Sequence, residues 1–108
     1  MTRGWPTESV CRACANARAA NVVTRSVRSQ RRRLARSKIR VNAVLPGFIN
    51  TPMADAVPEA IADSFKALIP LGHFGDPDDI ASMCTFLVSP QASYVTGAAI
   101  EVTGGFSM

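Results

Sequence analysis

The chain has 108 residues, of which 47% are hydrophobic, and its formal net charge is +4. This length is enough for one small domain and too short for two. The sequence contains no run of about 18 apolar residues and no apolar N-terminal stretch resembling a signal peptide, so we expect an intracellular protein without a membrane span.

The charge is divided unequally along the chain. Residues 1–40 contain ten Arg and one Lys against one Glu, a net of +10, whereas residues 41–108 contain one Lys against seven acidic residues, a net of −6. This asymmetry indicates a basic arm joined to an acidic body.

The three cysteines do not form a metal-binding pattern. Cys11 and Cys14 have the spacing of a zinc or redox pair, but no second Cys or His pair follows, and His73 is the only histidine. A tetrahedral zinc site would therefore lack ligands, and we predict no metal and three reduced thiols.

Residues 1–38 are Arg-rich and weakly patterned. Val22, Val23 and Val27 form a weak apolar face, while the run of arginines at 31–33 repels itself. The segment is therefore predicted to be a marginal helix ending near Ser37, or to be disordered.

A strand pattern follows over residues 39–45. Ile39, Val41, Ala43 and Leu45 occupy alternate positions, and the segment is rich in β-branched residues. Proline cannot donate to a strand ladder and glycine permits a turn, so the pair at 46–47 is expected to end the strand, with a further break at 50–52.

The next stretch predicts two helices. The first starts at Pro58, a favoured first helical position, and ends at Pro70. Its apolar face comprises Ile61, Phe65, Leu68 and Ile69. The second has Asp76 as N-cap and Pro77 in its first turn, and Ser89-Pro90 ends it. Its apolar stripe comprises Ile80, Ala81, Cys84, Leu87 and Val88.

A short apolar strand is predicted at residues 98–102, before Thr103 and two glycines. Residues 39–105 therefore form a strand–helix–helix–strand unit. A helical crossover usually joins parallel strands, and parallel strands need cover on both faces, which one such unit does not supply. We therefore expect an incomplete α/β fold.

Three stretches together resemble the C-terminal part of short-chain dehydrogenase/reductases. They are IRVNAVLPGFINTPM (39–53), IPLGHFGDPDDIA (69–81), and YVTG (94–97) followed by EVTGG (101–105). They occur in the order and spacing of that family. Within that family, the sequences of these stretches are most similar to the mitochondrial 17-beta-hydroxysteroid dehydrogenase and 3-ketoacyl (3-oxoacyl) reductase group.

The resemblance implies a Rossmann-type doubly wound parallel sheet that binds NAD or NADP at the carboxyl ends of its strands. In the family, the loop after this strand lies along the nicotinamide and the pyrophosphate. Carried over to this chain, Pro46 and Gly47 would shape that loop, Ile49 would offer backbone groups to the carboxamide, and Thr51 would bring a hydroxyl towards the phosphates.

The groups that perform the family's chemistry are not in the sequence. Hydride transfer there needs a tyrosine followed four residues later by a lysine, whereas Tyr94 is the only tyrosine and Ala98 stands four residues after it. By family spacing, the pair would fall at Asn16 and Ala20. The Gly-rich turn is also absent, because Gly4 is the only glycine before Gly47.

We therefore expect residues 39–108 to be the C-terminal part of an NAD(P)-dependent oxidoreductase of hydroxysteroids or 3-hydroxyacyl and 3-ketoacyl compounds, as in fatty acid metabolism. Alone, this chain is expected to be inactive, because it contains none of the family's catalytic residues. We expect it to be located in the mitochondrion or the cytoplasm.

Two alternative interpretations make the chain a non-catalytic module. Its basic arm could bind nucleic acid or an anionic membrane surface, or its C-terminal face could form a homo-oligomer or join a reductase subunit. The arm itself could instead be unrelated sequence joined to a truncated reductase, or a mitochondrial targeting segment.

Overall fold

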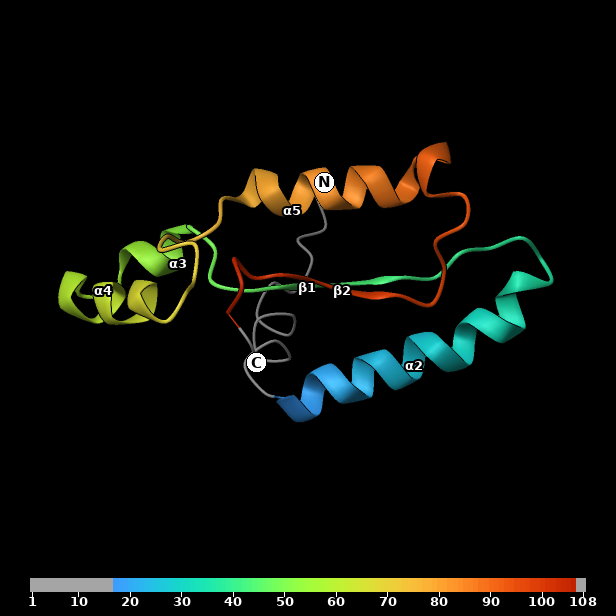
Figure 1. Cartoon of the computed structure of the whole chain (residues 1–108), viewed down its shortest axis with the longest axis horizontal. Helices are drawn as coiled ribbons and strands as arrows, with labels where there is room; N and C mark the ends of the chain where they lie inside the picture. The colour runs from blue at the N-terminus through green and yellow to red at the C-terminus, as the bar shows by residue number, and fades with distance from the viewer. Residues whose placement is uncertain (1–16, 107–108) are drawn as a thin grey trace, which may run out of the picture.

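Two short parallel strands lie at the centre of the structure, with one long helix on each face (Figure 1). The computed structural model describes residues 17–106, and the side chains of residues 23–106. Cys11, Cys14 and Asn16 therefore lie outside the described residues. The elements in order are α2 (Ala17–Ala35), β1 (Ala43–Pro46), α3 (Pro52–Asp55), α4 (Glu59–Ala67), α5 (Pro77–Val88), the 3-10 turn η1 (Pro90–Ala92) and β2 (Ala99–Val102).

The strand pairing confirms the predicted α/β class and the parallel crossover. Ala43 pairs with Ala99, and the register continues to Pro46 opposite Val102. Hydrogen bonds in a parallel ladder use alternate residues of each strand. Because Ala43 and Gly47 both donate to the β2 side, the N–H and C=O of Val44 point to the other edge of β1. Within the described residues, no strand covers that edge.

Helix α2 is longer and better packed than the sequence indicates. The predicted marginal or disordered segment contains a helix of 19 residues. Val27 is only 7% exposed, and Val23 and Leu34 are partly buried on the same side of the helix. Packing against the sheet accounts for this difference, because tertiary contacts of an apolar stripe supply most of a helix's stability. Helix α2 also covers the sheet face that the crossover unit leaves bare.

The C-terminal end of α2 is a Schellman motif. The N–H of Ile39 donates to the Leu34 carbonyl at 3.1 Å, and the N–H of Lys38 donates to the Ala35 carbonyl at 3.0 Å. Lys38 has a φ of +59°, in the left-handed region where glycine is usual. The helix therefore ends through backbone geometry, with a lysine in a strained conformation.

The start of α5 is as predicted, but its buried face is rotated. The Asp79 carboxylate accepts the N–H of Asp76 at 2.7 Å, part of a capping box. Leu87 is buried as predicted. Val88, however, is 80% exposed, and Ala81 and Cys84 are also exposed, so only part of the predicted apolar stripe is covered. The sheet instead receives Ile80, Met83 and Leu87, spaced i, i+3 and i+7.

The α3–α4 segment lies beyond the carboxyl ends of the strands and not over the sheet (Figure 1). Short helix α3 occurs where only a break was predicted. Helix α4 ends at Ala67, so Leu68 and Ile69 belong to the following turn. Of the predicted apolar face only Ile69, 3% exposed, is buried, whereas Ile61, Phe65 and Leu68 are exposed.

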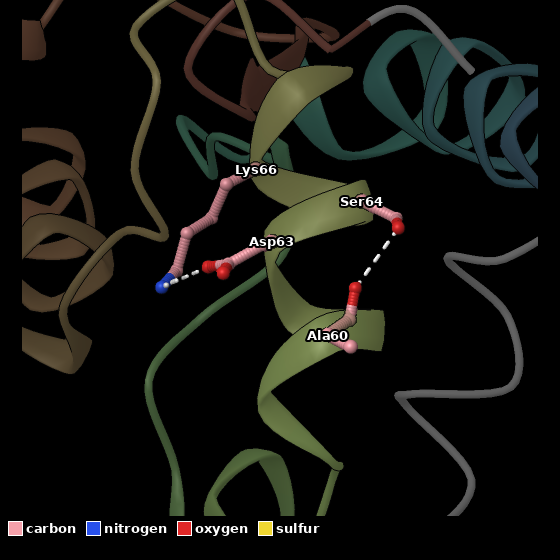
Figure 2. A network of polar contacts seen from close by, with 4 residues as sticks. All are labelled: Ala60, Asp63, Ser64 and Lys66. Atoms are coloured by element: carbon pink, nitrogen blue, oxygen red, sulfur yellow. Dashed lines mark hydrogen bonds and ion pairs between the residues drawn. The ribbon is translucent and has the colours of Figure 1, made fainter.

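The polar contacts of α4 are local to that helix. Lys66 Nζ lies 3.2 Å from Asp63 Oδ1, and the Ser64 hydroxyl donates to the Ala60 carbonyl at 3.0 Å (Figure 2). Exposed pairs of this kind contribute little to stability. Lys66 also lies 5.7 Å from the centre of the Phe74 ring. The attachment of α4 to the rest of the molecule therefore depends on aromatic packing.

Candidate functional site

The loop of residues 46–51, here called the 46–51 loop, leaves β1 at its carboxyl end. In open α/β sheets ligands bind outside the carboxyl ends of the strands. All four residues that sequence analysis assigned to a cofactor lie in this loop, and the strand that carries it is central to the core, since Leu45 is buried. The fold therefore positions this loop at the end of the sheet suited to a ligand.

Gly47 is placed where the chain tolerates no side chain. Its N–H donates to the Val102 carbonyl at 2.9 Å. A Cβ atom at this position would lie 2.7 Å from the Cα of Thr103, which is backbone and cannot easily move. Pro46, directly before it, ends β1. Gly47 is thus required by the close approach of the two strand ends.

The backbone of Ile49 is directed away from its neighbouring segment. Ile49 and Gly75 form an isolated parallel bridge, in which Gly75 donates to the Phe48 carbonyl at 2.9 Å and Asn50 donates to the Gly75 carbonyl at 2.7 Å. Among the described residues, the N–H and C=O of Ile49 itself take part in no hydrogen bond. Ile49 therefore offers one backbone donor and one backbone acceptor to a ligand.

Thr51 stands at the N-cap of α3 and is exposed. Its carbonyl accepts the N–H of Ala54 at 2.7 Å, whereas its hydroxyl makes no capping hydrogen bond. A threonine hydroxyl can both donate and accept. Thr51 thus offers a polar group two residues after Ile49.

Phe48 anchors this loop, although sequence analysis assigned it no role. Its ring centre lies 4.9 Å from that of Phe65, 5.8 Å from that of Phe74 and 5.2 Å from that of Phe106. Aromatic pairs at such distances are favourable beyond their buried area. No local pattern signals this cluster, because its four members come from four separate segments.

An apolar hollow of about 200 Å³ adjoins the 46–51 loop. Its walls include Thr51 together with Met53, Val57, Phe65 and Phe74. The combination of an apolar hollow with a few polar groups is typical of small-molecule sites.

Tyr94 lies at the wrong end of the sheet for chemistry at this loop. It is fully exposed and precedes β2, at the amino ends of the strands. The nearby polar contacts have a structural role. The side-chain amide of Asn42 donates to the Val95 carbonyl at 2.9 Å and accepts the N–H of Ala98 at 3.1 Å. These bonds join the start of β1 to the segment before β2.

Residues 17–106 contain no cluster of His, Cys, Asp or Glu arranged to hold a metal ion. His73 makes a 2.8 Å contact from Nδ1 to the adjacent Phe74 carbonyl. No helix in this part of the chain is long and apolar enough to cross a membrane.

Comparisons with known proteins extend over nearly the whole chain. Residues 2–107 match the family described as enoyl-(acyl carrier protein) reductase. This match includes the Arg-rich segment that one sequence interpretation treats as unrelated. The chain is 53% identical over 77 residues to a (3R)-3-hydroxyacyl-CoA dehydrogenase of Canis lupus familiaris, an alignment covering 71% of this chain and 30% of the relative.

Two solved structures share the fold. A 3-oxoacyl-[acyl-carrier protein] reductase from Brucella melitensis superposes with a TM-score of 0.80 at 32% identity, over 85% of this chain and 34% of that one. A blue fluorescent protein from a metagenomic library, in complex with NADPH, superposes with a TM-score of 0.75 at 37% identity, over 85% of this chain and 37% of that one.

The chain spans about a third of the length of these relatives. The motifs, the parallel strand–helix–strand unit and the match over residues 2–107 agree with one another. The chain is therefore a partial member of the short-chain dehydrogenase/reductase family of NAD(P)-dependent oxidoreductases.

Proposed function

We propose that this chain contributes the nicotinamide-side loop of an NAD(P)-dependent oxidoreductase site, and that it has no dehydrogenase activity alone. The observation that carries the proposal is the unused N–H and C=O of Ile49 at the carboxyl end of the sheet. Backbone groups can orient a carboxamide without placing a charge beside the transferred hydride. The Thr51 hydroxyl would bind a phosphate, and Pro46 and Gly47 would shape the loop.

The cofactor would supply the hydride, and the chain's own residues would bind and orient the cofactor. The apolar hollow beside Thr51 would contact apolar atoms of the substrate, which we propose to be a 3-hydroxyacyl or 3-ketoacyl compound or a hydroxysteroid. The proton-transferring tyrosine–lysine pair would have to come from elsewhere, because the chain has Tyr94 with Ala98 four residues later.

A chimaera tests the loop. Residues 39–106 replace the corresponding segment of an active 3-oxoacyl reductase, and turnover of NADH or NADPH with a 3-ketoacyl thioester is measured. We expect an active chimaera in which Thr51→Val raises the KM for the cofactor about tenfold, the value of one hydrogen bond, while Thr51→Ser does not. Identical kinetics for the two variants would contradict the assigned role of Thr51.

The isolated chain provides the complementary test. We expect no turnover of either cofactor with the same thioester. Turnover that Thr51→Ala abolishes would show that the chain is an enzyme alone, and would refute that half of the proposal.

A second candidate function is assembly with a reductase subunit. The open edge of β1 presents the N–H and C=O of Val44, and Val44, Cys84 and Val88 line a hollow of about 510 Å³ beside it. An uncovered strand edge invites pairing with another strand. Co-expression with an intact family member followed by size exclusion would test this function. We expect co-elution that Val88→Asp weakens, and separate elution would count against it.

A further inference from the structure

The exposed side of α2 carries a row of arginines, here called the arginine row: Arg25, Arg28, Arg32 and Arg36. They are spaced i, i+3, i+7 and i+11, with Arg36 in the turn that ends the helix, and all four are exposed. Positions three and four apart lie on one helix face, so the row is continuous. At 1.5 Å per residue, it extends for about 16 Å along a straight axis.

The arginine row points away from the sheet. At 100° per residue, Arg25, Arg32 and Arg36 lie opposite the buried Val27. Arg31 lies on the sheet side, where its side chain packs against Gly97. Packing of the helix therefore places the row in solvent.

Among residues 23–106, no acidic group pairs with these arginines. Helix α2 contains no Asp or Glu, and among residues 23–106 the one ion pair is between Lys66 and Asp63. Like charges three and four residues apart on one helix face repel one another and destabilise the helix. A ligand carrying a row of negative charges would relieve this repulsion.

We propose that the arginine row binds the phosphate backbone of duplex nucleic acid, without sequence preference. Guanidinium groups match phosphates in bidentate geometry, and the regular spacing on a rigid helix suits a regular polyanion. The segment from residue 17 to residue 38 contains no aromatic residue, so it cannot stack bases as binders of single strands do.

An anionic membrane fits this surface less well. Insertion into a bilayer requires an apolar face, but Val23, Val27 and Leu34 face the sheet. The exposed side chains between the arginines include Ser26 and Ser29. Apart from the small side chain of Ala35, the exposed residues of α2 from position 23 onward are therefore cationic or polar.

The test is fluorescence anisotropy of the full chain with a labelled duplex of about 20 base pairs, titrated between about 50 and 200 mM KCl. Four phosphate contacts predict a slope of log K against log salt of about −3.6 from the row, or roughly 150-fold in affinity over this range. Replacing all four arginines by glutamine should make the slope shallower by about 3.6, and Arg28→Gln alone by about 0.9.

Lys66→Gln is the matched control, because it removes one positive charge from α4 and should leave the slope unchanged. Circular dichroism of each variant verifies that the helix content is retained. An equal effect of Arg28→Gln and Lys66→Gln would overturn the proposal, since net charge alone would then explain binding. Tighter binding to a single strand of equal length, or to phosphatidylserine vesicles, would also overturn it, as would salt-sensitive self-association without duplex affinity.

Discussion

The double hydrogen bond of Asn42 allows the fold to be tested quantitatively. Asn42→Ala removes the donor to the Val95 carbonyl and the acceptor of the Ala98 N–H, at 2.9 and 3.1 Å, both in a part-buried setting. Each such bond contributes about 0.5–1.5 kcal/mol; the Ala98 N–H loses its partner, whereas the Val95 carbonyl keeps a hydrogen bond from the Arg40 guanidinium at 3.3 Å. We expect the free energy of unfolding to fall by about 2 kcal/mol.

Urea denaturation followed by circular dichroism measures this loss. With a slope of about 1.5 kcal/mol per M, the midpoint should move down by about 1.3 M. Asn50→Ala is the matched control, because the single hydrogen bond of Asn50 to Asp76 is exposed and should be worth less than about 0.5 kcal/mol. An equal decrease in the free energy of unfolding for the two variants would refute the conclusion that Asn42 links the segments before β1 and β2 through hydrogen bonds.

Three further features of the fold are tested by the same assay. Lys38→Gly should raise stability by about 1 kcal/mol by relieving the left-handed backbone, whereas Lys38→Ala should not. Gly47→Ala should lower it by about 1–3 kcal/mol, because the new Cβ meets the Thr103 backbone; an unchanged midpoint would show that the strand ends separate freely. Leu87→Ala should cost about 2–3 kcal/mol and Val88→Ala less than about 0.5, and a reversed order would contradict the observed face of α5.

Local chemistry explains which elements could be predicted from sequence. Asp76 caps α5 because a side chain three residues on can reach its N–H, and this contact needs no distant partner. The alternation predicted a strand at 39–45 and the apolar run one at 98–102, and the observed strands, 43–46 and 99–102, overlap them, although the first begins four residues later than predicted. The position of the 46–51 loop likewise follows from its place directly after a strand.

The features that could not be predicted depend on contacts between residues far apart in the sequence. The apolar stripe of α5 does not by itself show which of its side chains meets the sheet: Leu87 is buried, whereas the adjacent Val88 is 80% exposed. Phe48 gained its role from rings that lie far along the chain, and no spacing rule relates them. Ile61 and Leu68 have helical spacing, yet α4 lies beyond the sheet, and both side chains are exposed to the extent of about half or more among the described residues.

The sequence by itself determined the family, the parallel strand–helix–strand unit and the absence of a tyrosine–lysine pair, because each depends on which residues are present and in what order. The packed helix within the Arg-rich segment, by contrast, is seen only when the chain is folded against the sheet. Helix α2 has few apolar side chains, and most of a helix's stability in a protein comes from packing such side chains against the rest of the fold. Burial of Val27 against the sheet therefore stabilises α2 and leaves the arginines on the opposite, exposed side.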